Sequence, residues 1–216
     1  GLNLLNDSSR NIITVEDPVE YAIDGVSQTQ VNTKVGMTFS KGLRAILRQD
    51  PDIIMVGEMR DQETVDIGLR AALTGHLVLS TLHTNDAITS AMRLIDMGAP
   101  AYLVASSLRA IIAQRLVRRV CNDCRVPYLP DRQELSWLKY LGEEITDAQF
   151  SKGQGCTACN HSGYKGRVGI FELLEMDDAM MDALRVNDTQ GFAKAAKNSA
   201  NFSPLSTMAL NYAKQG

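Results

Sequence analysis

Apolar positions along the chain recur with two spacings, one typical of strands and one typical of helices. Short apolar runs predict buried strands at residues 11–16, 53–56 and 77–82. An alternating run at 26–31 predicts an edge strand. Helical spacing predicts helices over residues 38–49, 62–73 and 86–97, the first with Thr38 as its N-cap. Strands that alternate with helices of this length are typical of an α/β domain with a parallel sheet.

The second half of the chain has a less regular pattern. Residues 102–120 have the spacing of a long helix, or of two helices joined at a bend, and the arginines would lie away from its apolar face. A strand is predicted over 167–174. Further helices are predicted over 131–141, 177–186, 189–198 and 204–214, and residues 1–6 resemble the end of a helix.

Composition and charge limit the classes of function. The 216 residues, with 44% hydrophobic residues, suffice for one large domain or two modest ones. A net charge of -3 gives no general attraction to nucleic acid. No apolar run approaches the ~20 residues of a membrane helix. We therefore expect a soluble chain, which still leaves docking on a membrane protein open.

All cysteines of the chain lie in two Cys-x-x-Cys pairs, Cys121 with Cys124 and Cys156 with Cys159. Two such pairs supply the four thiolates of a closed tetrahedral shell, which suits structural zinc. Disulfide or redox use and unreactive thiols are the alternatives, and the absence of a recognisable signal peptide disfavours disulfides. His161 lies two residues beyond Cys159, but four thiolates already complete the shell.

Polar residues follow each of the three buried strands. They are Glu16 and Asp17, then Glu58 and Arg60, then His83 and Thr84. In parallel α/β sheets ligands bind beyond the carboxyl ends of the strands, although an isolated acid there is usually a solvated loop residue. An acid after an apolar strand is also the Walker B pattern, in which it holds magnesium through water or orients the attacking water. Asp52 opens its strand at the other end and is expected to be a strand-entry acid.

Three stretches resemble motifs of one protein family, in the same order. Residues 43–61 resemble the Walker B region of the type II secretion and type IV pilus assembly ATPases, residues 14–21 their Asp box and residues 74–86 their His box. The four cysteines are similar to the tetracysteine zinc module of the GspE/PilB branch, which the retraction ATPases lack. The resemblance covers nearly the whole chain, and within the branch it points to the assembly ATPases of mannose-sensitive haemagglutinin (MSHA) pili.

This resemblance implies three catalytic residues. Glu58 would be the catalytic glutamate that polarises the attacking water, and Glu16 the Asp-box acid near magnesium and that water. His83 would reach toward the γ-phosphate of ATP. By their spacing alone, His83 and His76 are equally compatible with simple caps on the strand that they flank.

The resemblance also implies three cofactor-binding residues, namely Asp17, His76 and Arg60. Arg60, just past the Walker B acid, is equally compatible with a packing role or a subunit contact. The implied cofactors are ATP and Mg²⁺ in the longer protein, together with structural Zn²⁺.

The implied fold is a truncated RecA-like P-loop NTPase core with a parallel sheet, a tetracysteine zinc module and a carboxyl-terminal helical region. We assign these to residues 1–118, 119–167 and 168–216. The implied protein is a cytoplasmic hexamer, peripheral at the inner membrane, that powers pilus assembly or secretion by acting on a membrane platform protein. No nucleic-acid partner is expected.

One family motif is missing. The chain has no Gly-Lys dipeptide, so it lacks the P-loop sequence GxxxxGK[ST] that cradles phosphates. Residues 1–5 resemble the helix that follows the P-loop. We therefore expect a piece of a longer protein that by itself neither binds ATP tightly nor hydrolyses it.

Two alternatives remain at this stage. One is a zinc-stapled module that binds nucleic acid through Arg115, Arg118, Arg119 and Arg125. The other is a dithiol redox protein that uses one Cys-x-x-Cys pair. Both leave the acids and the histidine at the strand ends without a role.

Overall fold

A computed structural model describes residues 1–140 and 150–215 of the protein, and the chain divides into two compact units. The first unit consists of Gly1–Ile111 with Glu175–Ala200, and the second of Ile112–Leu174 with Asn201–Gly216. Each unit is assembled from segments that are far apart in the sequence. The division of the chain at residues 118 and 167 stays a prediction.

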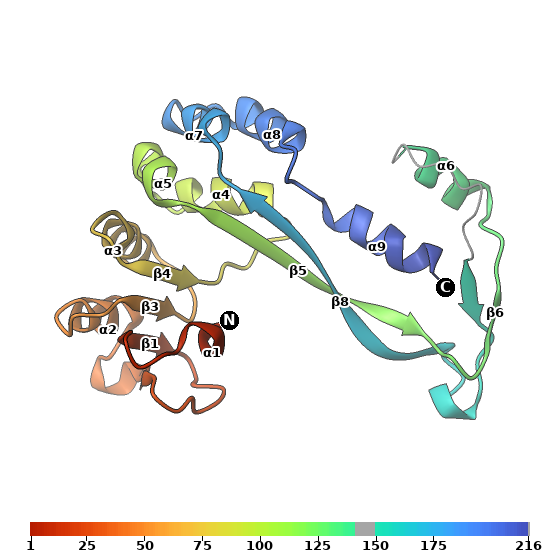
Figure 1. Cartoon of the computed structure of the whole chain (residues 1–216), viewed down its shortest axis with the longest axis horizontal. Helices are drawn as coiled ribbons and strands as arrows, with labels where there is room; N and C mark the ends of the chain where they lie inside the picture. The colour runs from red at the N-terminus through yellow and green to blue at the C-terminus, as the bar shows by residue number, and fades with distance from the viewer. Residues whose placement is uncertain (141–149, 216) are drawn as a thin grey trace. The chain divides into compact units, whose positions relative to one another are not determined.

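The first unit is built on a parallel sheet, as predicted. Its strands are β1 (Ile12–Glu16), β2 (Ser27–Gln30), β3 (Ile53–Val56) and β4 (Leu77–Ser80). They are ordered β2-β1-β3-β4, and every neighbouring pair is parallel. Figure 1 shows β1, β3 and β4 side by side and pointing the same way. The carboxyl ends of these strands therefore lie at one edge of the sheet.

The burial of the strands differs in part from the prediction. β1 is buried along its whole length and β3 lies inside the sheet, while β2 is an edge strand, all as predicted. β4 was predicted to be buried, and this is wrong: within the described residues it is the other edge strand, and its Leu77 is 44% exposed. An apolar run of this length does not reveal on how many sides its strand has neighbours.

Most helices of the first unit begin where a short polar side chain caps them, and α1 and α5 begin without such a cap. The helices are α1 (Leu2–Leu5), α2 (Phe39–Ile46), α3 (Gln62–Leu73), α4 (Ala87–Asp96), α5 (Ala101–Ser107), α7 (Asp178–Arg185) and α8 (Thr189–Asn198), with a 3-10 turn, η1, at Thr33–Val35. The Thr38 side chain accepts a hydrogen bond from Lys41 N–H, which confirms the predicted cap of α2. Asp61 and Asp86 cap α3 and α4 in the same way. These caps satisfy amide groups that have no partner inside the helix.

The core of the first unit lies between the sheet and helices α2 and α3. Its buried members are Ile13, Val15, Phe39, Leu43, Ile46, Ile54, Val56, Ile67 and Ala71. Leu43, Ile54 and Val56 have no measurable exposure. Further along, α5 packs against α3 and α7, and α7 packs against α8. The apolar residues of α2 and α3 therefore cover the sheet, and α5, α7 and α8 pack on other helices.

The long helix predicted over residues 102–120 is wrong. Helix α5 ends at Ser107, Leu108 is extended, and β5 (Ala110–Val120) follows as a strand. β5 pairs with β8 (Tyr164–Glu175), whose predicted core at 167–174 is confirmed. The apolar residues of this stretch fit a helix face by spacing alone, and the strand becomes favourable only through a partner about fifty residues away.

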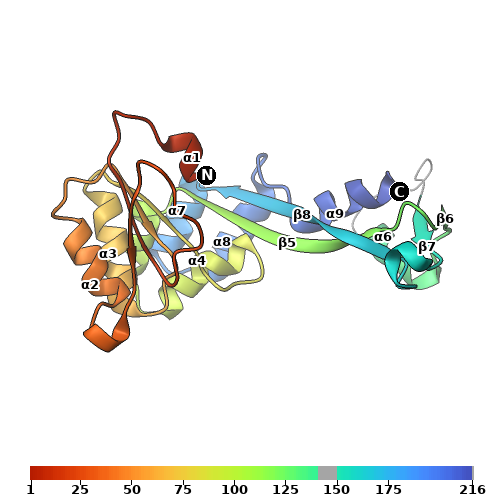
Figure 2. The same ribbon diagram turned by 90° about the horizontal axis from the view of Figure 1, so that it is seen from below.

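The second unit holds the four cysteines. A short antiparallel pair, β6 (Arg125–Pro127) with β7 (Ser151–Gly153), was not predicted. The unit also contains α6 (Arg132–Tyr140), the 3-10 turn η2 (Thr157–Cys159) and α9 (Leu205–Lys214). Residue 141, the predicted end of the α6 helix, lies outside the described residues. Figure 2 shows α9 running along β8, where Leu205 N–H donates to the Glu172 carboxylate over 3.0 Å. No helix of the described part of the chain is both long and apolar enough to cross a bilayer.

Candidate functional site

The polar residues predicted to converge do so at the carboxyl edge of the parallel sheet. Gly57 N–H donates to the Val15 carbonyl over 2.8 Å, so the end of β3 lies against the end of β1. A Cβ atom at Gly57 would lie 3.3 Å from the Glu16 Cα, which is tighter than most contacts of this kind. Gly57 thus lets the backbones that carry Glu16 and Glu58 approach closely.

The end of β4 is tied to the same place. Thr81 Oγ1 donates to the Gly57 carbonyl over 2.6 Å, and Met59 N–H donates to the Thr81 carbonyl over 3.2 Å. These bonds place His83 next to Glu58, with His83 Nε2 at 3.1 Å from Glu58 Oε2. We call Glu16, Glu58, Arg60 and His83 the strand-end cluster.

Glu58 is the buried centre of the strand-end cluster. The residue is 8% exposed, and its carboxylate contacts Arg60 through Oε1 and His83 through Oε2. Burial raises the pKa of the Glu58 carboxyl group, but the hydrogen bonds and charges of Arg60 and His83 outweigh burial and hold this pKa below its ordinary value. Glu58 is therefore a carboxylate at neutral pH, able to accept a proton or to orient a water molecule.

The lowered pKa predicts a pH-dependent contribution of Arg60 to stability. Arg60 stabilises only the charged form of Glu58, so the Arg60→Gln substitution should reduce the unfolding free energy at pH 7. Because the Arg60 side chain is 62% exposed, we expect a loss of at most about 1 kcal/mol. The loss should shrink as the pH falls below about 4.5, the ordinary pKa of glutamate, and disappear once Glu58 is protonated in the folded state.

Chemical denaturation at pH 7 and at pH 3.5 would measure this difference. Arg48→Gln is the matched control, because it removes the same charge from an exposed side chain with no ion pair among the described residues. If Arg60→Gln lowers the unfolding free energy equally at both pH values, the assigned contact of Arg60 with the Glu58 carboxylate is contradicted.

Glu16 lies on the neighbouring strand and is also buried, at 8% exposure. Its Oε1 accepts hydrogen bonds from Thr14 Oγ1 at 2.5 Å and from Gln28 Nε2 at 2.9 Å. The sequence predicted no contact of Thr14 or Gln28 with Glu16. The pairing of β1 with β2 places Gln28 opposite Thr14, and only this register reveals the contact with Glu16.

The remaining predicted cofactor-binding residues are placed differently. Asp17 follows Glu16 at the same edge and is exposed. His76 lies before β4, at the opposite edge, where its Nδ1 lies 2.9 Å from the Ala71 carbonyl at the end of α3. The structure thus separates His76 from the strand-end cluster and gives it a capping contact. Asp52 lies at that opposite edge too and accepts Asn11 N–H over 2.7 Å, as expected for a strand-entry acid.

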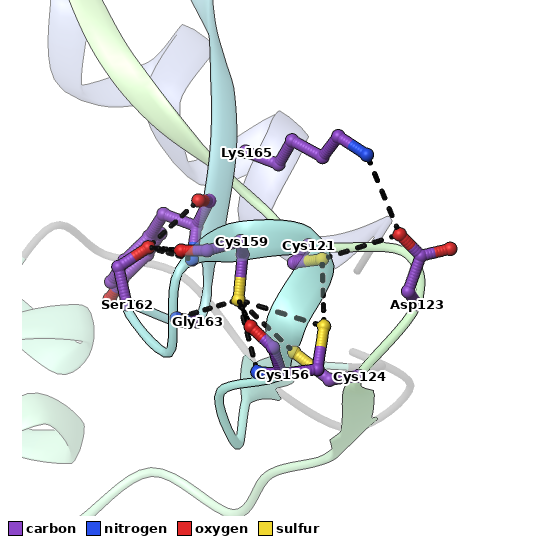
Figure 3. A network of polar contacts seen from close by, with 9 residues as sticks. Cys121, Asp123, Cys124, Cys156, Cys159, Ser162, Gly163 and Lys165 are labelled. Atoms are coloured by element: carbon purple, nitrogen blue, oxygen red, sulfur yellow. Dashed lines mark hydrogen bonds and ion pairs between the residues drawn. The ribbon is translucent and has the colours of Figure 1, made fainter.

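The four cysteines form a second candidate site, within the second unit. Figure 3 shows the sulfur atoms of Cys121, Cys124, Cys156 and Cys159 pointing toward one another. All four Sγ atoms lie within 4.8 Å of one another, with separations of 3.9, 3.9 and 3.7 Å for three of the pairs. A tetrahedron of thiolates at the usual Zn–S distance of about 2.3 Å has edges of about 3.8 Å. The cluster therefore fits a tetrahedral metal ion, and none of the four cysteines is in a disulfide.

Backbone amides around the cysteines are oriented to support thiolate ligands. Cys159 Sγ accepts N–H groups of Cys156 and Gly163 at 3.2 and 3.3 Å, and Cys124 Sγ accepts Gly155 N–H at 3.3 Å. The bond from Cys156 is the main cause that lowers the pKa of the Cys159 thiol to about 6. Burial instead raises the pKa of the Cys124 thiol to about 11. A bound cation would favour the charged form of every thiol in the cluster.

The arginines considered for nucleic-acid binding lie on strands, because β5 replaces the predicted helix. Arg115, Arg118 and Arg119 are exposed on β5, and Arg125 begins β6. The Arg118 guanidinium lies over the Tyr164 ring, 4.0 Å from its centroid. His161 is exposed and lies outside the cysteine cluster.

The parallel sheet with helices packed on it places the first unit in the α/β class, whose open sheets bind ligands beyond the carboxyl ends of the strands. Within this class, the chain belongs to the family of type II/IV secretion system proteins, whose family model matches residues 1–216. It is 54% identical over 184 residues to the type II secretion system ATPase E of Vibrio cholerae, which covers 85% of this chain. It is 53% identical over 175 residues, 81% of this chain, to the type IV pilus assembly ATPase PilB of Thermus thermophilus.

Solved structures agree with this family. A crystal structure of the pilus retraction motor PilT with bound ADP superposes with a TM-score of 0.70 at 30% identity, covering 100% of this chain and 52% of that one. The ATPase DotB of Legionella pneumophila superposes with a TM-score of 0.66 at 25% identity, covering 97% and 49%. The chain spans 36% of the length of the Vibrio relative and 20% of the Thermus relative. The predicted family is therefore confirmed, and the finer assignment to MSHA pili stays a prediction.

Proposed function

We propose that this chain is the part of a hexameric ATPase motor that carries its water-activating residues, and that the motor hydrolyses ATP to power type IV pilus assembly or type II secretion. The observation that carries the proposal is the contact of the buried Glu58 carboxylate with His83, next to Glu16, at the ligand-binding edge of a parallel sheet. Relatives that share about half of its residues are named as ATPases of these two systems.

In this proposal each residue of the strand-end cluster has a role. Glu58 polarises the attacking water, Glu16 lies near magnesium and that water, and His83 reaches the γ-phosphate. Arg60 holds the Glu58 carboxylate charged until nucleotide and magnesium arrive. Asp17 is exposed beside Glu16, and we assign to it a contact with the water shell of the magnesium ion. His76 lies before β4, at the opposite edge of the sheet from these groups, and therefore has no role in this proposal.

The second unit would have a structural task in this motor. Four converging sulfur atoms with amide donors suit zinc that fixes β6, β7 and η2, not a catalytic metal with an open position. We further propose that the motor is cytoplasmic, lies at the inner membrane and acts on a membrane platform protein there. The location and the partner follow from the family resemblance alone.

Calorimetry and phosphate release test the proposed function together. The full-length protein should bind Mg-ATP and release phosphate, whereas the 216-residue chain should do neither, because it lacks the GxxxxGK[ST] sequence. That sequence supplies several charge-assisted hydrogen bonds of about 1.5–3 kcal/mol each. Micromolar Mg-ATP affinity of the chain would refute its proposed inactivity, and a full-length protein without magnesium-dependent hydrolysis would refute the motor.

A further inference from the structure

Gln28 links Glu16 to the loop that follows β1. Its Nε2 donates to Glu16 Oε1 over 2.9 Å and to the Tyr21 carbonyl over 3.0 Å. Its Oε1 accepts Ile23 N–H over 2.8 Å. The amide thus makes three hydrogen bonds, which uses both its donors and one acceptor site.

These bonds restrict the Glu16 carboxylate to one orientation. Thr14 and Gln28 both donate to the same oxygen, Oε1, and the three side chains meet where β1 pairs with β2. Across residues 1–140 and 150–215, no hydrogen bond uses Glu16 Oε2. With Oε1 held from two sides, rotation of the carboxylate is opposed and Oε2 is the oxygen left to meet a ligand at the sheet edge.

Glutamine fits these contacts better than the residues nearest to it in size. A glutamate would place a second carboxylate at hydrogen-bond distance from Glu16, and the two charges would repel. An asparagine, one methylene shorter, would not span from β2 to Glu16 and to the loop together. A methionine of similar length would keep the packing but donate no hydrogen bond.

We propose that Gln28 is a positioning residue for ATP hydrolysis, which it supports by holding the Glu16 carboxylate with Oε2 presented to the magnesium ion and the attacking water. This inference rests on the proposed function, since it acts through Glu16. Gln28 itself touches no reacting atom. Its removal should therefore lower turnover and leave nucleotide binding nearly unchanged.

A double-mutant cycle in the full-length protein tests this role. Steady-state ATP hydrolysis would be compared for the wild type, Gln28→Met, Glu16→Gln and the double variant. We expect Gln28→Met to lower kcat by about 10- to 100-fold while KM changes less than about threefold. The double variant should be no slower than Glu16→Gln by more than about twofold, because Gln28 has no effect once its target is gone.

Gln30→Met is the matched control, because Gln30 lies on the same strand, is exposed and contacts Val19 N–H instead of Glu16. It should keep the wild-type kcat. If Gln28→Met does not fold, Gln28→Glu serves in its place: it keeps the length of the side chain and the acceptor for Ile23, but it loses the donor to Glu16 and adds a charge that repels it, so its loss of kcat should be at least as large as that expected for Gln28→Met. Circular dichroism would establish which variants are folded.

The outcomes separate the two proposals. A Glu16→Gln variant with wild-type turnover removes the assigned role of Glu16, and the inference falls with it. If Glu16→Gln is inactive while folded Gln28 variants have the same kcat as Gln30→Met, the proposed motor function is unaffected. Only the inference about Gln28 is then overturned. Additive losses in the double variant would show that Gln28 acts independently of Glu16, which also overturns it.

Discussion

Replacing Cys159 with serine is expected to abolish metal binding and to unfold the surroundings of the four cysteines. We expect the wild-type chain to carry one zinc ion, and the variant none, by inductively coupled plasma mass spectrometry. Cys159 is 6% exposed, and its sulfur accepts two backbone N–H groups, so the hydroxyl of serine would be a weaker ligand in a shell shaped for sulfur. Structural zinc contributes about 10–16 kcal/mol of apparent binding free energy in zinc-finger peptides, and much of this would be lost.

Hydrogen exchange would locate the damage. The amides of β6, β7 and η2 should exchange faster in Cys159→Ser, whereas β1 and β3 should stay protected, because the first unit has its own buried core. His161→Gln is the control for the alternative ligand and should keep the zinc. A wild-type chain that contains two disulfides and no metal, or a Cys159→Ser variant with full zinc content, would contradict the zinc site.

Glu58→Gln should reduce ATP turnover of the full-length protein by about 10²- to 10⁴-fold, the range of a general base or water-orienting group. Glutamine keeps the size of the side chain but can neither accept a proton nor carry the charge that Arg60 and His83 contact. Binding of Mg-ATP should persist, because the substitution leaves the phosphate-binding backbone untouched. Phosphate release and calorimetry on the same preparation would measure both quantities.

Glu63→Gln is the matched control for this substitution. Glu63 is an acid on α3 with its own arginine partner, Arg44 at 2.8 Å, but its side chain is 57% exposed. Its replacement should change turnover less than about twofold, as is usual for a surface ion pair. Turnover that survives Glu58→Gln would remove the assignment of the catalytic acid, and equal losses in both variants would point to instability.

The candidate sites could be predicted from sequence where their residues are close in the chain, or where each residue follows a strand of the same parallel sheet. Two Cys-x-x-Cys pairs predict a shared ion because the spacing within each pair already brings two sulfur atoms together. Glu16, Glu58 and His83 could be expected at one edge because parallel strands end on the same side. Gln28 could not be found in this way, because its role depends on which strand lies beside β1 and in which register.

The sequence by itself determined the α/β class, the Thr38 cap, the helices that start near residues 62 and 86, and the acids at the strand ends, because caps, helical faces and short apolar runs depend on neighbours a few residues away. Only the tertiary structure decided that residues 110–120 form a strand and that β4 is an edge strand of the described sheet. Each of these depends on a partner far along the chain. The free energy that favours each arrangement comes from strand pairing and burial, and a local sequence pattern does not show which segments pair.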